Sequence, residues 1–239
     1  MLPIQEFKPL NNIAIIPARG GSKRIPRKNI RIINGMPLIA RTIQNAIKSN
    51  LFDQVVVTTE DTEIKSIAEE YGAIVPFLRN SIIADDHTPT VPVVADAILQ
   101  LGKLGYLAEN YCCIYPAAIL VNTDDLVQSY SLLLDNLTID YVVSITKFNY
   151  PIQRALEKGM NGRYVLSNPE FLETRSQDLT ERWHDAGQFY WGKKKSWVNQ
   201  ISILSSHFSG YEIPSWRVQD LDTEDDWARL EKILLATTT

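Results

Sequence analysis

The sequence is poor in the residues that build disulfide frameworks and zinc sites. It has two cysteines and three histidines among 239 residues. The cysteines, Cys112 and Cys113, are neighbours, so a bridge between them would be strained, and on a strand they would point to opposite faces. We therefore expect two reduced core thiols, as in a cytoplasmic protein. The spacing of cysteine and histidine that is typical of zinc ligands is missing as well.

Long apolar runs are missing too. No stretch approaches the roughly 20 apolar residues of a membrane-spanning helix. Residues 1–12 lack the basic and then apolar pattern of a secretion signal. The net charge of −4 argues against a protein that binds nucleic acid by neutralising phosphates. We expect no membrane anchor and no nucleic-acid partner.

Acidic residues are absent from one long stretch. Between Phe7 and Phe52 there is no aspartate or glutamate, whereas five acids crowd into residues 220–226. A solvated basic face and an acidic helix start would explain both runs. The basic residues, however, interleave with glycine, serine, proline and asparagine, which favours a loop that binds a compact anion. These basic residues are Lys8, Arg19, Lys23, Arg24, Arg27, Lys28, Arg31, Arg41 and Lys48.

Short apolar runs alternate with helical patterns along most of the chain. This alternation predicts an α/β fold of three layers, a mainly parallel sheet covered by helices, in a single domain of residues 1–239. We expect strands at residues 13–16, 54–59, 73–75, 111–115 and 141–146. Helices are expected at residues 37–48, 91–101 and 223–235, and others begin at Asp61 or Thr62 and at Asn122 or Thr123. The last helix would bury Trp227, Leu230, Ile233 and Leu234.

The alternation breaks after Tyr150. Asn161-Gly162 between two apolar pairs predicts a hairpin turn. We therefore expect residues 150–190 to leave the sheet as an arm. The arm carries aromatic and apolar residues without an obvious core of its own, so we predict that it packs on a second subunit in a homodimer.

The strongest chemical signal is the loop after the first strand, residues 17–29. Ligands of such sheets bind at the carboxyl ends of strands. Gly20 and Gly21 carry no side chains, so backbone N–H groups there can approach an anion closely. Ser22 adds a hydroxyl donor, and Arg19, Lys23 and Lys28 can bring positive charge onto a triphosphate. The glycine spacing is neither that of the P-loop nor that of the dinucleotide fingerprint.

A pair of carboxylates, Asp220 and Asp222, precedes the last helix. Two carboxylates two residues apart in an extended segment can hold Mg²⁺, which takes one or two carboxylates and completes its shell with water and phosphates. Alternatively, Asp222 caps the helix and the other acids oppose its dipole. The residues alone favour neither interpretation.

The loop Ala18-Arg19-Gly20-Gly21-Ser22-Lys23, continued by Pro26 and Lys28-Asn29, resembles the phosphate-binding signature of the CMP-sugar synthetases, the acylneuraminate cytidylyltransferases. The resemblance extends over nearly the whole chain after residue 12. It implies a Rossmann-like nucleotide-diphospho-sugar transferase fold and CTP as a substrate. It also implies that Arg79 contacts the cytosine and that Asp220 and Asp222 hold Mg²⁺. Residues 85–90 match the segment that follows this arginine in the family. Tyr115 stands where the family has a glutamine, a departure that is similar to the pseudaminic acid branch.

Two later segments resemble the sugar side of this family. Residues 150–156 contain Gln153 and Arg154, and residues 185–192 contain Gln188 and Tyr190 in a form that looks like the pseudaminic acid branch. Arg154 could pair with the carboxylate of the sugar or with a local acid. The aromatic residues 189–191 are more simply explained as core positions of a strand, whereas a buried Gln188 would need hydrogen-bond partners.

The resemblance implies transfer of CMP from CTP to the anomeric hydroxyl of a nine-carbon acidic sugar, pseudaminic acid, with Arg19, Lys23 and Asp222 as catalytic residues. Sialic acid or a related ulosonic acid is the alternative acceptor. A non-catalytic nucleotide-binding module and a structural interaction protein are the alternatives of other classes, because a fold alone does not fix a function.

Overall fold

The computed structural model describes residues 10–84, 88–205 and 207–237. Residues 1–9 and the first three residues of segment 85–90 therefore lie outside the described residues. Within the described ranges, no helix combines the length and the apolar character needed to cross a bilayer.

A mixed sheet of six strands forms the centre of the fold, in the order β10-β6-β9-β5-β1-β4. Its strands are β1 (Leu10–Pro17), β4 (Gln54–Thr58), β5 (Ala108–Ile114), β6 (Tyr141–Lys147), β9 (Trp183–Lys193) and β10 (Phe208–Glu212). Pairing is parallel at β4–β1, β1–β5 and β6–β10, and β9 runs antiparallel to both β5 and β6. The beginning of β9 therefore lies at the edge where β1, β5 and β6 end.

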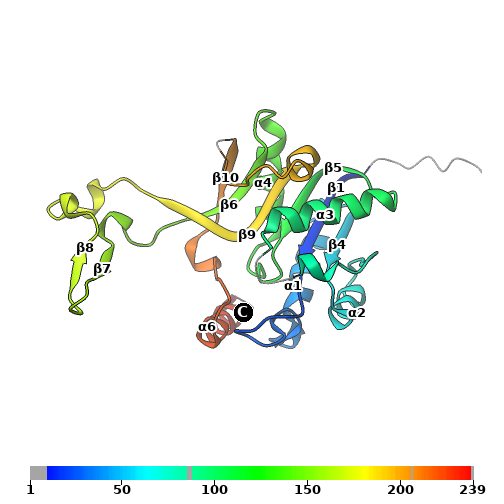
Figure 1. Ribbon diagram of the computed structural model, residues 1–239, viewed down its shortest axis with the longest axis horizontal. Helices are drawn as coiled ribbons and strands as arrows, with labels where there is room; N and C mark the ends of the chain where they lie inside the picture. The colour runs from blue at the N-terminus through cyan, green and yellow to red at the C-terminus, as the bar shows by residue number, and fades with distance from the viewer. Residues whose placement is uncertain (1–9, 85–87, 206, 238–239) are drawn as a thin grey trace, which may run out of the picture.

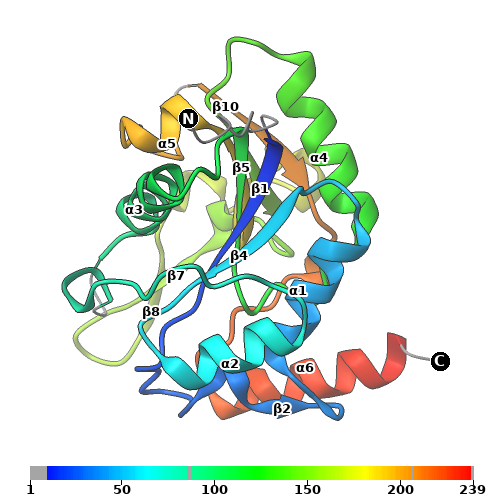
Figure 2. The same cartoon turned by 90° about the vertical axis from the view of Figure 1, so that its right-hand side faces the viewer.

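Helices cover both faces of the sheet (Figure 2). One apolar cluster joins α1 (Leu38–Lys48), α2 (Thr62–Glu70) and α4 (Thr123–Asp135) to one face, and a second joins α3 (Thr90–Lys103) and α5 (Lys194–Val198) to the other. Cys112 belongs to the first cluster and Cys113 to the second, both fully buried. The three-layer, mainly parallel architecture predicted from the alternation is confirmed.

Most element boundaries follow the expected capping residues. Pro37 precedes α1, Asp61 caps α2 through its side chain, and Asn122 caps α4 in a capping box with Asp125. Six 3₁₀ helices connect the larger elements of the described chain: Lys28–Ile30, Ser81–Ile83, Ile152–Arg154, Pro169–Phe171, Ser176–Asp178 and Ser215–Arg217.

The last helix, α6 (Glu224–Thr237), builds a separate apolar cluster. It buries Trp227, Leu230 and Leu234, whereas Ile233 is only half-buried. These side chains pack against Ile25 and Ile33, which belong to the segment that follows β1. The C-terminal helix thus supports the basic loop rather than the sheet.

Three expectations about the strands need correction. The strand predicted at residues 73–75 is a single bridge between Ile74 and Val56. The pattern did not predict the small hairpin of β2 (Ile32–Ile33) and β3 (Met36–Pro37), nor β10. Runs this short carry too little periodicity to be recognised.

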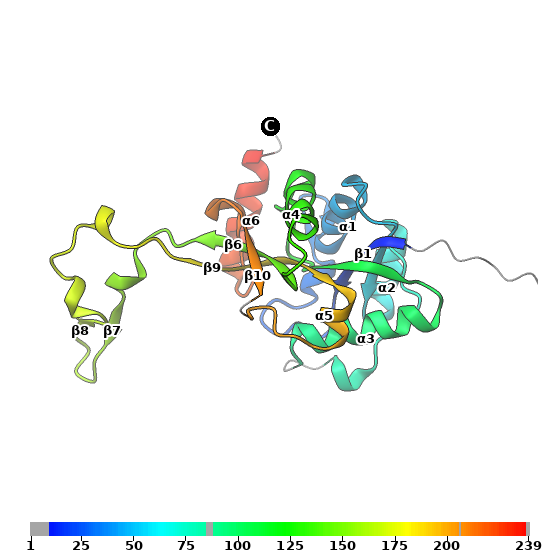
Figure 3. The same ribbon diagram turned by 90° about the horizontal axis from the view of Figure 1, so that it is seen from above.

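The excursion exists, but it ends earlier than residue 190. The hairpin of β7 (Leu156–Lys158) and β8 (Tyr164–Leu166) turns at Gly162, which has a positive φ of 76°, and it stands away from the sheet (Figures 1 and 3). Residues 183–190 instead belong to β9, between β5 and β6. Alternation explains this, because Phe189 and Trp191 face one apolar cluster and Tyr190 faces the other.

Candidate active site

A cavity of about 680 Å³ opens at the edge of the sheet where the parallel strands end. Five groups of residues from distant parts of the sequence form its walls: the loop after β1, Arg79, Ile83 and Thr88 with the start of α3, the residues that follow β5, the start of β9, and residues 218–220. Among its lining residues are Arg19, Lys28, Asn29, Arg79, Thr90, Tyr115, His184, Gln188 and Asp220. The antiparallel direction of β9 brings its first residues into this group.

A smaller hollow of about 290 Å³ adjoins the cavity, with Arg19, Lys28 and Asn29 common to both. Its lining includes Ser22, Lys23 and Asp222. The structure therefore brings the basic loop and the distant carboxylate pair together, with Asp220 in the cavity and Asp222 in the hollow. Ala18 is fully buried, and Ala18, Gly20 and Gly21 are absent from the lining of either space.

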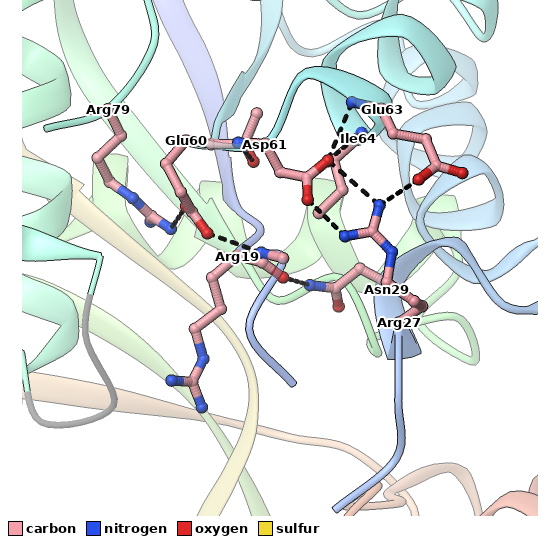
Figure 4. A network of polar contacts seen from close by, with 10 residues as sticks. Arg19, Arg27, Asn29, Glu60, Asp61, Glu63, Ile64 and Arg79 are labelled. Atoms are coloured by element: carbon pink, nitrogen blue, oxygen red, sulfur yellow. Dashed lines mark hydrogen bonds and ion pairs between the residues drawn. The ribbon is translucent and has the colours of Figure 1, made fainter. Parts of the chain in front are cut away.

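The basic loop is held in place from the start of α2 (Figure 4). Arg27, in the left-handed region with a φ of 55°, pairs with Asp61 and, at 2.5 Å, with Glu63. The amide of Asn29 donates to the carbonyl of Arg19 at 2.9 Å. A Cβ at Gly20 would lie 2.2 Å from Oδ2 of Asp61. The loop therefore requires glycine at position 20 for its close approach to Asp61.

Glu60 is a site residue that the sequence pattern did not reveal. Its Oε1 accepts the Gly20 N–H at 2.7 Å, and its Oε2 accepts Arg79 at 2.8 Å. The Gly20 N–H is thus used within the chain rather than offered to an anion, which corrects the expectation for that group. Arg79 is 6% exposed and lines the cavity. The sequence did contain one signal for Glu60, since this glutamate stands at the end of a strand, next to the aspartate that caps the following helix.

Figure 4 also shows that the Arg19 side chain points away from the Glu60 and Asp61 carboxylates. Arg19 lines both the cavity and the smaller hollow. The two arginines near Glu60 therefore differ: Arg79 is anchored to a carboxylate, and Arg19 is directed toward the space where an anion would lie.

Lys28 connects the basic loop to the carboxylate pair. Its Nζ donates to the carbonyl of Leu221 at 2.7 Å, between the two aspartates. Burial lowers the pKa of Lys28, and the negative charges of Asp220 and Asp222 partly oppose this shift. Arg24 pairs with Asp222 at 2.6 Å. Lys28, which we expect to bind a triphosphate, therefore also holds residues 220–222 in place.

Asp222 does not cap α6. The hydroxyl of Thr223 accepts the N–H of Asp226, and the carboxylate of Asp226 accepts the N–H groups of Asp222 and Thr223. Thr223 and Asp226 thus satisfy the start of the helix, and the capping explanation for Asp222 is wrong. Asp220 lines the cavity and Asp222 lines the adjoining hollow.

Tyr115 and the first residues of β9 form another part of the wall. The Tyr115 hydroxyl bonds with Thr90, and burial raises the pKa of Tyr115 to about 12. Tyr190 does not line the cavity; its ring meets Tyr115 edge-on at 5.7 Å, and its hydroxyl donates to Asp185 at 2.7 Å. Burial also raises the pKa of Tyr190. Gln188 lines the cavity, and its side chain donates to the carbonyl of Ala186 at 2.8 Å.

Gln153 and Arg154 lie elsewhere. Both belong to the 3₁₀ helix at the beginning of the arm, and neither lines the cavity. Gln153 donates to the carbonyl of Thr180 at 2.8 Å, and the exposed Arg154 donates to the carbonyl of Thr174. Within one chain, the structure therefore does not bring these two residues to the cavity that Gln188 lines.

A basic loop and a carboxylate pair that line two adjoining spaces at the carboxyl edge of a mainly parallel sheet are features of a nucleotide-dependent transferase of α/β fold. The cytidylyltransferase family model matches residues 13–148, which is more than half of the chain. The chain belongs to the cytidylyltransferase family.

Individual relatives agree with this assignment. A pseudaminic acid cytidylyltransferase of Campylobacter jejuni is 42% identical over 91% of this chain and 93% of the relative. A CMP-N,N'-diacetyllegionaminic acid synthase of Legionella pneumophila is 27% identical over 93% of this chain and 95% of the relative. The solved structure of a CMP:2-keto-3-deoxy-manno-octonic acid synthetase with CTP matches with a TM-score of 0.70 at 16% identity, over 96% of this chain and 100% of that one. At that identity it shows the common fold.

The Arg27–Asp61 contact predicts a pH-dependent stability. The hydrogen bond from Arg27 and those from the backbone of Ile64 and Glu63 lower the pKa of Asp61. A lowered pKa means that this stabilisation is present at neutral pH and is lost as the pH falls through the range where the folded carboxylate protonates. Asp61→Asn keeps a capping side chain, so it should lower the free energy of unfolding near pH 7 by about 1 kcal/mol.

Urea unfolding of the wild type and of Asp61→Asn, from pH 7 down to about pH 3, measures the free energy of unfolding of each protein. The difference between the two free energies should shrink below about pH 4. Glu63→Gln is the matched control, because Glu63 is 65% exposed and should contribute little. A difference between wild type and Asp61→Asn that stays constant across this range would contradict the expectation.

Proposed function

We propose that this protein transfers CMP from CTP to the anomeric hydroxyl of pseudaminic acid, with release of pyrophosphate. One observation carries the proposal: Lys23 of the basic loop and Asp222, from the distant end of the sequence, line the same hollow beside a cavity of about 680 Å³. The pseudaminic acid cytidylyltransferase of Campylobacter jejuni supports the choice of acceptor.

The reaction is a displacement at phosphorus. The anomeric oxygen of the sugar forms a bond to the α-phosphorus of CTP, the bond between the α- and β-phosphates breaks, and the hydroxyl proton leaves. Arg19 and Lys23 neutralise the triphosphate and the departing pyrophosphate, so the protein acts by positioning and by stabilising charge. Asp222 is our candidate for the proton acceptor, because its carboxylate lies in the hollow with Lys23.

Arg79 is our candidate for recognition of the base. Its guanidinium offers only donors, and the O2 and N3 atoms of cytosine are acceptors, whereas N3 of uracil carries a hydrogen. The nearly complete burial of Arg79 and its bond to Glu60 limit its movement. A fixed donor at the cavity wall therefore favours cytosine over uracil.

The residues present fit a magnesium ion. Asp220 and Asp222 supply two hard oxygen ligands and leave the other positions to water and phosphate, as Mg²⁺ prefers. Among the described residues, no group of three or more His, Cys, Asp or Glu side chains could hold a metal by itself, which agrees with a site completed by the nucleotide. Bound there, Mg²⁺ would neutralise phosphate oxygens. Arg24 would give up its bond to Asp222, which its exposed side chain permits.

Lys23→Ala tests the proposed role of the basic loop. Lys23 is exposed, so the variant should keep its fold and its melting temperature. Removing a well-placed charge contact should reduce turnover about a hundredfold or more. Release of pyrophosphate from CTP and pseudaminic acid measures this. Lys48→Ala removes the same charge from the exposed end of α1 and should keep wild-type turnover. Unchanged turnover of Lys23→Ala would contradict the proposal.

Nucleotide and metal selectivity can be tested without the sugar. We expect CTP with Mg²⁺ to raise the melting temperature more than CTP alone and more than ATP, GTP or UTP with Mg²⁺, because only the native state binds. Asp220→Asn should reduce the part of the shift that depends on Mg²⁺. Equal shifts for all four triphosphates would argue against a cytosine-specific site. An unchanged shift in Asp220→Asn would argue against Asp220 as a ligand of Mg²⁺.

The arm supports a homodimer. Its side chains include many exposed apolar groups, and patches of this kind are typical of protein interfaces. We expect light scattering at micromolar concentration to give twice the chain mass of 27.1 kDa. Leu156→Asp on β7 should shift the mass to one chain, whereas Leu134→Asp, at an exposed leucine of α4, should not. A single-chain mass for the wild type would exclude this dimer. The exposed apolar residues of the arm include Tyr150, Ile152, Leu156, Met160, Tyr164, Val165 and Leu172.

A further inference from the structure

The end of β4 holds two parts of the nucleotide site at once. The N–H of Ala18, near the start of the basic loop, donates to the carbonyl of Thr58 at 3.0 Å. The N–H of Arg79 donates to the carbonyl of Thr59 at 2.8 Å. Glu60 is the next residue of the chain. The backbones of the loop and of Arg79 are therefore attached to neighbouring residues of one short segment.

The side chain of Glu60 repeats this attachment with a single carboxylate. Its Oε1 accepts the Gly20 N–H at 2.7 Å, and its Oε2 accepts the guanidinium of Arg79 at 2.8 Å. Figure 4 shows the Glu60 side chain between Arg79 and the loop that carries Arg19. Because both oxygens belong to one rigid group, the two donors are held at a fixed separation.

Glu60 acts through these donors and does not contact a ligand directly. It is absent from the lining of the cavity and of the adjoining hollow, whereas Arg79 and Arg19 both line the cavity. Arg79 marks the place where we expect the cytosine, and Arg19 is directed toward the place of the phosphates. The carboxylate therefore lies behind the wall and joins the base side of the cavity to its phosphate side.

The burial of Arg79 makes this carboxylate necessary. The side chain of Arg79 is 4% exposed and that of Glu60 is 25% exposed. A buried cation that loses its only counter-charge is strongly destabilised, so it moves or draws in water. Glu60 thus keeps the guanidinium in one orientation, and the same group fixes the distance from that guanidinium to the loop.

We propose that Glu60 is a positioning residue that sets the separation between the cytosine and the triphosphate of the bound nucleotide. CTP gains affinity because its base and its phosphates meet preorganised partners at the same time. UTP gains less, since its N3–H would face the donors of Arg79, and inorganic triphosphate gains nothing because it has no base. This inference rests on the nucleotide half of the proposed function, with CTP as the nucleotide and Arg79 at its base.

Glu60→Gln tests the proposal, because it keeps the size of the side chain and leaves one acceptor oxygen for two donors. Calorimetry without sugar measures the Kd values of CTP, UTP and inorganic triphosphate, each with Mg²⁺. The Kd of CTP should rise about tenfold, and the preference for CTP over UTP should fall by a similar factor. The Kd of inorganic triphosphate should stay unchanged, because the cations of the basic loop remain.

Glu60→Asp separates the span of the side chain from its charge. Aspartate keeps the negative charge beside Arg79, so this variant should keep its fold and most of its melting temperature. Its side chain is one methylene shorter, so its carboxylate cannot reach both donors from the same backbone position. It should therefore show the same pattern of Kd values as Glu60→Gln. A wild-type preference for CTP in Glu60→Asp would mean that only the charge matters and would overturn the positioning role.

Glu69→Gln is the matched control. It makes the same substitution on α2, where the side chain of Glu69 is 46% exposed and lies 3.8 Å from the ammonium group of Lys65. Exposed pairs of this kind contribute little to stability, so the variant should keep its fold and all three Kd values.

A double variant separates positioning from a loss of stability. Glu60→Gln leaves Arg79 buried without its counter-charge and should lower the melting temperature. Adding Arg79→Met removes that charge and should recover part of the stability. The preference for CTP should stay as low as in Arg79→Met alone, because Glu60 acts through Arg79 and the two effects do not add. Recovery of the preference together with the stability would show that Glu60 serves folding only.

The remaining outcomes separate this inference from the proposed function. If the wild type prefers CTP and both Glu60 variants keep that preference, the positioning role is wrong and the proposed function stands. Weaker binding of inorganic triphosphate, to the same extent as CTP, would also overturn the role, because Glu60 would then act on the loop alone. Tighter binding would overturn it as well, because Glu60 would then compete with phosphate for the Gly20 N–H.

The reverse case is equally distinct. If the Glu60 variants lose the preference for CTP, but the wild type releases no pyrophosphate with CTP and any nonulosonic acid, the proposed transfer fails and the positioning role stands. Equal affinity of the wild type for CTP and UTP would overturn the role of Arg79 and that of Glu60 together.

Discussion

The direction of one strand determines how this site is assembled. β9 runs antiparallel between β5 and β6, so its first residues lie at the edge where the parallel strands end. Asp185, Gly187 and Gln188 thereby reach the same cavity as Arg19 and Tyr115. The same reversal places the arm at this edge, because the arm connects β6 to β9. A parallel β9 would place its first residues at the opposite edge of the sheet, away from Arg19 and Tyr115.

The site balances its charges internally. Arg79 pairs with Glu60, Arg27 with Asp61, and Arg24 with Asp222. These contacts differ in kind, because Arg79 is almost fully buried and Arg24 is 68% exposed. Buried pairs of this type are costly to break, whereas exposed pairs contribute little. The Arg79–Glu60 contact is therefore the most costly to break, the Arg27–Asp61 contact, with Arg27 40% exposed, is intermediate, and the Arg24–Asp222 contact can be exchanged for a ligand without a large loss.

The sequence predicted the architecture well, because buried parallel strands and capped helices leave clear local patterns. β1, β4, β5 and β6 were recognised from apolar runs, and Asp61 and Asn122 from their capping positions. It also singled out the loop and the aspartate pair. The direction of β9 was not predictable, since an aromatic run such as residues 189–191 is equally compatible with either direction in a sheet.

Side-chain partners were the other information that local patterns could not supply. The bond from Glu60 to the Gly20 N–H joins residues 40 positions apart, and the bond from Lys28 to the Leu221 carbonyl joins residues 193 positions apart. Neither spacing has a periodic signature. The position of Gln153 and Arg154 outside the cavity of one chain was not predictable either, because similarity to a family segment does not tell which subunit or surface a side chain reaches.

The packing of α6 has a consequence for synthesis on the ribosome. Ile25 lies in the basic loop and Ile33 follows it, yet their apolar partners, Trp227, Leu230 and Leu234, are translated much later. Chains grow from the N-terminus, so earlier segments begin to fold before these partners emerge. The basic loop is therefore made early, and its apolar support is completed only after α6 has been made.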